Sequence, residues 1–228
     1  MKRPPLSSTS LIAHPYRPPA GFVGVQPPVH KASTIVFANM AAVRARKWKE
    51  KTGYTYGLHG TPTTFILEER IATLEGGVQT LLVPSGLAAI TVVDIAFLKS
   101  GDEVAIPDNA YGPGREFARN ELAGWGIAHR FYDPMEPASL VAAIGERTRL
   151  VWVEAPGSVT MEFPDLAALV RICRERGVVS ALDNTWGAGL AFAPFAIAGD
   201  DDDGCAVDIS VQALTKYPSG GADVLMGA

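Results

Sequence analysis

Short apolar runs alternate with longer amphipathic stretches from Thr61 onward. Runs of four to seven residues that are apolar nearly throughout are typical of strands buried on both faces of a sheet. Six runs have this character: 80–83, 103–106, 127–132, 150–154, 178–183 and 207–213. We therefore expect a series of buried strands over this part of the chain.

The stretches between these runs carry apolar residues at helical spacing. Leu67, Ile71 and Leu74 share one face of a predicted helix. A Thr-Pro pair at 61–62 is typical of the start of a helix, and a Gly-Gly pair at 76–77 is typical of its end. Further helices are predicted from Ser85 and Gly86 onward and at 113–122, 137–146 and 164–176.

The helix predicted at 164–176 has the clearest boundary signals. Pro164 and Asp165 fall in its expected first turn, and Gly177 follows its end. Cys173 shares a face with apolar residues of this helix, so we expect a buried structural thiol.

Alternation of buried strands with helices predicts an α/β fold with a mostly parallel sheet and helices on both faces. We expect this domain to occupy residues 61–228. Residues 1–60 carry many prolines and no strand–helix alternation, which indicates an N-terminal arm with one short helix around 39–49. The acidic run 200–203 lacks the ligand spacing of a calcium loop and is predicted to be a solvated loop.

Composition excludes several classes of protein. Apolar residues make up 47% of the 228 residues and charged residues 19%, which is typical of a folded domain. The net charge of −4 leaves no basic footprint for nucleic acid or for a membrane surface. No apolar run reaches the roughly 20 residues of a membrane-spanning helix, and the N-terminus lacks a signal-peptide core. We expect a cytoplasmic protein.

Two cysteines, Cys173 and Cys205, make neither a disulfide framework nor a metal-ligand pair. The four histidines show no ligand spacing either: His14, His30, His59 and His129. We expect no metal site.

Ligands of open α/β sheets bind beyond the carboxyl ends of the strands, where two polar groups are predicted to lie. Ser85, Gly86 and Leu87 open a helix after a short strand and could cradle a phosphate, although an ordinary N-cap is the simpler interpretation. Asp183 ends an apolar strand and needs a partner, which could be a protonated ring nitrogen, a salt bridge or a capped N–H.

Two further groups have the same placement. Lys216 follows the apolar run 207–213; a lysine in a dry site loses its proton and can form an imine, whereas most lysines reach solvent. Tyr111 follows the run 103–106 and could stack on a flat ligand or simply cover the core. A phosphate cradle, a carboxylate, an aromatic ring and an amine are together the requirements of pyridoxal phosphate (PLP).

The chain also resembles a known family, the Cys/Met-metabolism class of PLP enzymes, and within it the bacterial cystathionine β-lyases. The resemblance runs from about Gly53 to Ala228. Six blocks carry it in order: "YTYGLHGTPTTFILEERIATLEGG", "LLVPSGLAAI", "DNAYGPGR", "VWVEAPGSVTMEFPD", "ALDNTWGAGLAF" and "SVQALTKYPSGGADVLMG". The fourth and sixth blocks favour the β-lyase branch over γ-lyases and γ-synthases.

The resemblance implies a role for each candidate residue. Lys216 would attach the cofactor and move protons, Asp183 would pair with the pyridinium nitrogen, and Tyr111 would stack on the ring. Ser85, Gly86 and Leu87, assisted by Thr215, would hold the phosphate. Tyr56 would reach the phosphate of a neighbouring subunit, which implies a homodimer or homotetramer with shared active sites. The implied fold is the large domain of PLP fold type I, with a sheet of the seven-stranded type.

The chain departs from the family pattern in two ways. Many relatives have an arginine where Leu58 stands, and His59 is a weak candidate to replace it at the phosphate. Relatives also continue well beyond Ala228, with the rest of the large domain and a small domain whose arginine binds the substrate carboxylate. We therefore expect this chain to be C-terminally truncated.

Three functional hypotheses follow. The resemblance implies β-elimination of cystathionine to homocysteine, pyruvate and ammonia, a step of methionine biosynthesis. A second hypothesis is a γ-lyase or a general cysteine-S-conjugate β-lyase. A third is an inactive fragment that binds PLP weakly or not at all.

Overall fold

The computed structural model describes residues 21, 24, 26–51, 53–197, 205–221 and 223–228. The chain divides into two compact units, Met1–Thr63 and Thr64–Ala228, and each is considered by itself. Five of the N-terminal prolines and the acidic run 200–203 lie outside the described residues.

The described part of the second unit contains a five-stranded parallel sheet in the order β2-β1-β3-β4-β5. Its strands are β1 (Glu103–Pro107), β2 (Ala128–Tyr132), β3 (Thr148–Glu154), β4 (Val179–Asp183) and β5 (Ile209–Val211). The central strand β3 pairs with both β1 and β4, and its residues 150–154 are all buried. The predicted α/β class with a parallel sheet is therefore confirmed.

Two predicted strands were wrong in extent. The run 80–83 forms no strand: Val83 makes an isolated antiparallel bridge to Gly227, and the Leu82 N–H donates to Oε1 of Glu68 at 3.1 Å and not to a neighbouring strand. The run 207–213 is a strand only at Ile209–Val211, because beyond it the backbone of Gln212 pairs with Ala228 and not with β4.

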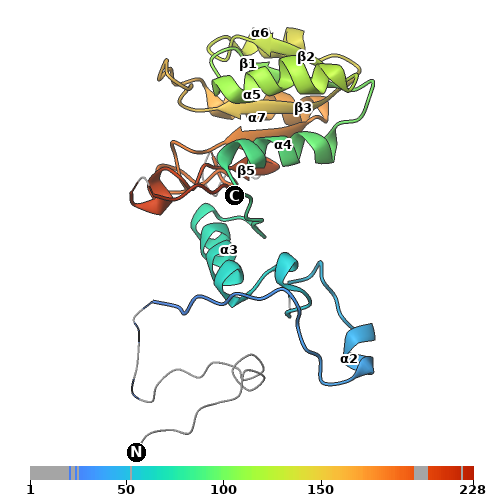
Figure 1. Ribbon diagram of the computed structural model, residues 1–228. Coiled ribbons are helices and arrows are strands. Elements are labelled where there is room, and N and C mark those ends of the chain that lie inside the picture. Colours follow the sequence, from blue (N-terminus) through green and yellow to red (C-terminus); the bar gives the residue numbers. More distant parts are fainter. Residues whose placement is uncertain (1–20, 22–23, 25, 52, 198–204, 222) are drawn as a thin grey trace, which may run out of the picture. The chain divides into compact units, whose positions relative to one another are not determined.

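Helices cover both faces of the sheet (Figure 1). The helices α4 (Gly86–Phe97) and α5 (Gly112–Phe117) share one apolar cluster with β1, β3 and β4. The helices α6 (Pro137–Ala143) and α7 (Leu166–Arg176) share the other. Period-two alternation along β3 sends Trp152 into the first cluster and Val151 and Val153 into the second. Alternate residues of a strand thus face opposite helix layers.

Helix boundaries follow local capping chemistry. Asp165 is the N-cap of α7, since its Oδ1 accepts the Ala168 N–H at 2.9 Å, so Pro164 and Asp165 precede the helix and do not form its first turn. Gly177 ends α7 with φ of +64°, a conformation that costs glycine little. The segment predicted as one helix at 113–122 is α5 followed by a π-helical turn, η2 (Ala118–Leu122). The helix predicted at 137–146 ends at Ala143, because Ile144 is extended.

The first unit contains little regular structure in its described residues. The helix α2 (Met40–Arg44) is shorter than predicted and is capped by Asn39, whose Oδ1 accepts the Ala42 N–H at 2.9 Å. A single 3₁₀ turn, η1 (Gly57–His59), precedes α3 (Pro62–Glu75), which crosses the division between the units. No helix among the described residues is long and apolar enough to cross a membrane. The thiols of Cys173 and Cys205 are both buried, and the two residues form no disulfide.

Candidate functional site

The carboxyl ends of β3, β4 and β5 lie side by side. In the strand register, Glu154 pairs with Asp183, and Asp183 pairs with Val211. Trp152 and Ala181 belong to the apolar cluster that includes α4 and α5. Glu154 lies two residues after Trp152 on β3, and Asp183 lies two residues after Ala181 on β4. Because side chains two residues apart in a strand share a face, both carboxyl groups face that helix layer. The register thus places two acidic side chains on one face at one edge of the sheet.

Asp183 is a partly buried carboxylate without a cationic partner in the described part of the chain. Its Oδ1 accepts the Thr185 N–H at 3.0 Å. Burial raises the pKa of Asp183, and the hydrogen bonds from Thr185 only partly oppose this shift. A cation brought close to Asp183 would offset this cost, so the position is suited to a protonated ligand nitrogen.

Ser85, Gly86 and Leu87 form the beginning of α4. The Ser85 hydroxyl accepts the Ala88 N–H at 3.0 Å, and its carbonyl accepts the Ala89 N–H at 3.1 Å. The N–H groups of Gly86 and Leu87 have no acceptor among the described residues. Both predicted roles fit here, because Ser85 is the N-cap while two free N–H groups at the helix N-terminus can bind an anion.

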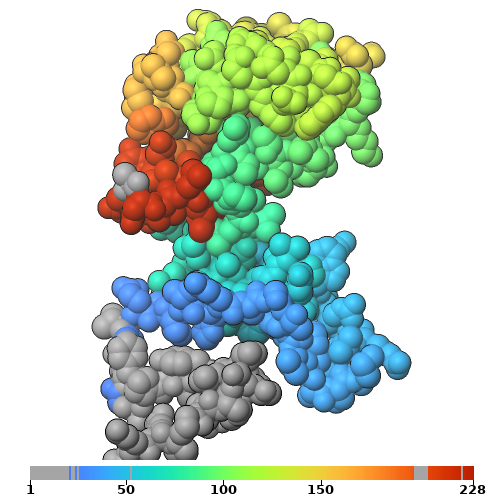
Figure 2. Space-filling view, in the orientation of Figure 1, coloured from blue at the N-terminus to red at the C-terminus, as the bar shows by residue number. Residues whose placement is uncertain are grey.

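The segment that carries Thr215 and Lys216 packs against this helix start. Gly227 bridges Val83 on one side and Ala213 on the other. Figure 2 shows the red C-terminal segment beside the blue-green atoms of the middle of the chain. A Cβ atom on Gly86 would lie 2.6 Å from the Ala213 Cβ, which is closer than real contacts allow. Glycine at position 86 therefore lets the helix start approach the lysine segment.

Thr215 and Lys216 lie in the turn after β5. The Thr215 hydroxyl lies 3.2 Å from the Met226 N–H nitrogen and 3.3 Å from the Met226 carbonyl oxygen, so both of its hydrogen-bonding roles are used within the turn. Lys216 precedes the 3₁₀ turn η3 (Tyr217–Ser219), and its side chain is exposed. The expectation of a dry environment for Lys216 is not met by the described residues, because the residues that follow it are themselves mostly exposed.

Hydrogen bonds join the lysine segment to the end of β4. The Thr185 hydroxyl accepts the Ala213 N–H at 2.9 Å, and the Asn184 N–H donates to the Val211 carbonyl at 2.7 Å. The two residues after Asp183 are thus tied to the turn that leads to Lys216.

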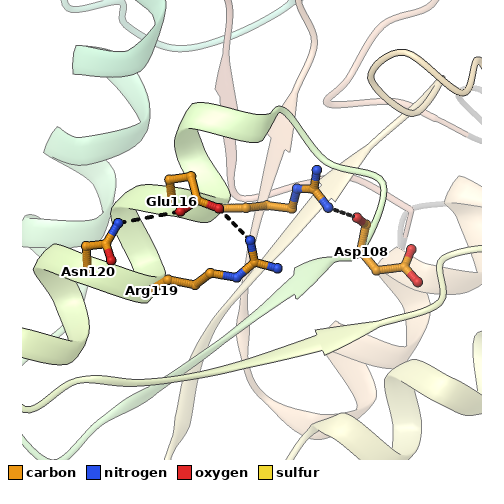
Figure 3. Close-up of polar contacts among 5 residues, drawn as sticks. Asp108, Glu116, Arg119 and Asn120 are labelled. Carbon is orange, nitrogen blue, oxygen red and sulfur yellow. Dashed lines mark hydrogen bonds and ion pairs between the residues drawn. The ribbon is translucent and has the colours of Figure 1, made fainter.

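Tyr111 is the N-cap residue of α5, in the loop after β1, and its ring is exposed. Its backbone N–H donates to Oε2 of Glu154 at 2.8 Å. Arg115, one turn into α5, donates to the Asp108 carbonyl and so ties the helix to the end of β1. Figure 3 shows this contact region, in which Glu116 accepts hydrogen bonds from Arg119 and Asn120. The Tyr111 N–H therefore holds the loop against β3, and Arg115 holds the start of α5 against the end of β1.

Tyr56 belongs to the other unit, and its placement relative to this site is not defined. Its ring is exposed and lies edge-on to His59, with centroids 5.9 Å apart. His59 also stacks on Trp48 at 5.1 Å, and its Nδ1 lies 3.0 Å from the Thr55 hydroxyl. Leu58 points to solvent, with 84% of its surface exposed. The roles of Tyr56 and His59 stay predictions.

Sequence reasoning missed two carboxyl groups, one at the end of β3 and one that contacts the residues after β4 and β5. Glu154 was assigned only as the last residue of a strand, although it ends an apolar run in the same way as Asp183. Glu75, at the end of α3, is buried and accepts Nδ2–H of Asn184 at 3.0 Å and Nε2–H of Gln212 at 2.9 Å. Burial raises the pKa of Glu75, and no local sequence pattern signals this long-range contact.

The grouping fits PLP on its own chemistry. Asp183 lacks a cation, the start of α4 has two free N–H groups, and an exposed aromatic ring and an amine follow β1 and β5. Among the described residues no cluster of histidine, cysteine or carboxylate side chains could hold a metal ion. The donor set is that of an organic cofactor with a phosphate and a basic nitrogen.

Comparison with known proteins agrees with this set. The chain matches the model of the Cys/Met metabolism PLP-dependent enzymes over residues 8–228. It is 42% identical over 203 residues to a candidate cystathionine β-lyase of Rhizobium johnstonii, covering 89% of this chain and 48% of that protein. It is 36% identical over 214 residues to an L-alanine/L-glutamate racemase of Wolbachia pipientis, covering 90% and 51%.

A solved structure shares the fold. The candidate O-acetylhomoserine (thiol)-lyase of Campylobacter jejuni, which contains N'-pyridoxyl-lysine-5'-monophosphate, matches with a TM-score of 0.81 and 28% identity. The match covers 90% of this chain and 49% of that chain. The chain thus spans about half the length of the relatives it matches.

Proposed function

This chain belongs to the Cys/Met metabolism PLP-dependent enzyme family, and from that premise we propose that it is the cofactor-binding part of a cystathionine β-lyase. Cystathionine and water would give homocysteine, pyruvate and ammonia. The observation that carries the proposal is Asp183, a partly buried carboxylate without a cationic partner among the described residues. The Lys216 turn and a helix start with two N–H groups that lack an acceptor among the described residues support it.

Each residue has a distinct task in this proposal. The free N–H groups of Gly86 and Leu87 bind the phosphate, with the helix dipole of α4 in their favour. Asp183 pairs with the protonated ring nitrogen, and Tyr111 stacks on the ring face. When bound, PLP withdraws electrons from the α-carbon of the substrate.

Lys216 has two tasks, attachment of the cofactor and proton transfer. Its exposed amine would attach the cofactor through the aldehyde. Once displaced by the amine of the substrate, the Lys216 amine would take the proton from the substrate α-carbon and give it to the departing sulfur. Loss of the β-substituent then releases the thiol. Water hydrolyses the remaining three-carbon unit to pyruvate and ammonia.

The choice of β-elimination rests on sequence similarity. The 42% identity to the Rhizobium candidate and the "EAPGSVTMEFPD" and "SVQALTKY" blocks favour the β-lyase branch. The racemase and the thiol-lyase among the similar proteins show that related chains support other reactions. A γ-lyase would release 2-oxobutyrate from cystathionine, so the identity of the keto acid distinguishes the two reactions.

We also propose a homodimer or homotetramer, in which Tyr56 reaches the phosphate of a neighbouring subunit. The exposed ring of Tyr56 is free for such a contact. An inactive fragment that binds PLP weakly or not at all is the competing hypothesis.

The direct test is Lys216→Ala. We expect the variant to release no pyruvate from cystathionine and to form no borohydride-reducible adduct with PLP, because no amine remains to attach the cofactor. Lys99→Ala, which changes another exposed lysine, is the matched control and should behave as wild type. Pyruvate release by Lys216→Ala at the wild-type rate would refute the assignment, and a wild-type protein without a PLP absorbance band would favour the inactive fragment.

A further inference from the structure

Glu154 and Asp183 are direct register partners on adjacent parallel strands. Neighbouring strands lie about 4.8 Å apart, and both side chains face the α4 and α5 layer, so the two carboxyl groups are close together. Only Asp183 has a place in the reaction proposed above. Glu154 is the more buried of the two, with 5% of its surface exposed.

The Glu154 carboxyl group also holds the loop that carries Tyr111. Its Oε2 accepts the Tyr111 N–H at 2.8 Å, between residues 43 positions apart in the chain. Of the nearby cations, Arg115 attracts the Glu154 charge, but its Nη1 already donates to the Asp108 carbonyl. Glu154 therefore contacts the predicted ring stacker and lies beside the predicted partner of the ring nitrogen.

The charge state of Glu154 responds to its surroundings. Burial, followed by the negative charge of Asp183, raises the pKa of Glu154 to about 8, and the Tyr111 N–H, Arg115 and the Ser158 backbone oppose the shift. Two adjacent carboxylates in a poorly solvated site do not both ionise readily. The other titratable groups around this edge are Asp108 after β1, Tyr132 at the end of β2 and Asp94 of α4.

We propose that Glu154 is a positioning residue of the cofactor site, which fixes the Tyr111 loop through its carboxyl oxygen and, by keeping its proton, leaves the negative charge to Asp183. The inference rests on the proposed function. In this role Glu154 fixes the position of Tyr111 and the charge of Asp183 at the same time.

The first measurement is PLP binding as a function of pH. The dissociation constant is obtained from the visible absorbance of the bound cofactor between about pH 6 and pH 9, for wild type and Glu154→Gln. In wild type we expect the constant to change near the pH at which Glu154 loses its proton. Glu154→Gln keeps an oxygen that accepts the Tyr111 N–H but cannot ionise, so its profile should lack this change. Glu154→Ala also loses the acceptor and should bind PLP about tenfold more weakly.

The second measurement needs no added PLP. Because the folded-state pKa of Glu154 lies above that of the unfolded chain, the folded protein binds the extra proton between about pH 4.5 and pH 8. Its contribution to stability is complete below this window and is lost as the pH rises through it. We therefore expect the Tm of wild type to fall more steeply across the window than that of Glu154→Gln.

Asp94→Asn is the matched control. Burial raises the pKa of Asp94 to about 7, and its Oδ1 accepts the Trp152 Nε1–H at 2.8 Å, so its carboxyl group is hydrogen-bonded to Trp152 and not to Tyr111 or Asp183. The variant should flatten the Tm profile but keep the wild-type pH dependence of PLP binding. A Glu154→Gln protein whose PLP profile and Tm profile both match wild type would overturn the role of Glu154. Failure of wild type to bind PLP at any pH would instead overturn the proposed function.

Discussion

The buried carboxylates at the two ends of the sheet differ in whether they have a cationic partner. At the amino end, Glu103 of β1 is 3% exposed and is fully partnered, with Arg130 Nε at 2.9 Å and the Thr148 hydroxyl at 2.9 Å. At the carboxyl end, Asp183 and Glu154 face each other, and neither forms an ion pair among the described residues. The carboxylate at the amino end has both an ion pair and a hydroxyl partner, whereas the two at the carboxyl end accept backbone N–H groups and have no ion pair among the described residues.

This difference suggests that the carboxylate at the amino end contributes to folding, whereas those at the carboxyl end serve the proposed ligand site. A buried carboxylate that is paired and hydrogen-bonded contributes to folding, and its removal leaves polar partners behind. A carboxylate that lacks a cation costs stability, and the role proposed for Asp183 would offset this cost with a protonated ligand nitrogen. Three substitutions test this contrast.

Asp183→Asn should have the largest effect on cofactor chemistry. Loss of the charge that pairs with the ring nitrogen is expected to lower the rate of pyruvate release by on the order of 10²–10³. Burial raises the folded-state pKa of Asp183, so its contribution to stability falls as the pH rises above the usual carboxyl range. The PLP-free variant should therefore be at least as stable as wild type at pH 8 in urea unfolding. A variant that is strongly destabilised and still active would reverse the comparison.

Glu103→Ala should do the opposite. The variant leaves the Thr148 hydroxyl and the Arg130 guanidinium without their carboxylate partner. We therefore expect a loss of about 1–3 kcal/mol in the free energy of unfolding. Affinity for PLP, measured by its absorbance in the folded protein, should stay unchanged. Weaker PLP binding without loss of stability would contradict the structural role of this end of the sheet.

Asp165→Ala should have the smallest effect of the three substitutions. This carboxylate is exposed and caps α7 through the Ala168 N–H at 2.9 Å. Loss of an N-cap of this kind costs about 1 kcal/mol. Urea unfolding should show this small decrease, with no effect on PLP binding. A larger loss than in Glu103→Ala would mean that burial is not what distinguishes these carboxylates.

Local signals in the sequence were enough for most of the fold. The buried strands β1, β3 and β4 lie within one or two residues of their predicted starts and ends, because they are apolar runs with clear boundaries. The start of α4 at Ser85 and the end of α7 at Gly177 were also predictable, since both depend on the chemistry of a single residue.

The remaining features depend on contacts that a sequence pattern does not contain. Val83 is apolar like a strand residue, but within the described part of the chain it makes an isolated bridge to Gly227 and joins no strand. The exposure of Lys216 depends on the turn that follows β5, and the pairing of Glu154 with Asp183 depends on the register of two strands. The cofactor could be predicted because its requirements combine four residue types in order. The supporting role proposed for Glu154 required the register and the Tyr111 hydrogen bond.

The double bridge of Gly227 has a consequence for how the site forms in time. Its backbone pairs with Val83 and Ala213 at once, and a Cβ atom there would lie 2.3 Å from the Ser85 carbonyl oxygen. Contacts between residues so distant in the chain carry a large loop-closure cost and form slowly. During synthesis, the two bridges of Gly227 therefore form only after residue 227 has left the ribosome. The β1–β2 pair and its helix, in contrast, can form from local contacts well before that moment.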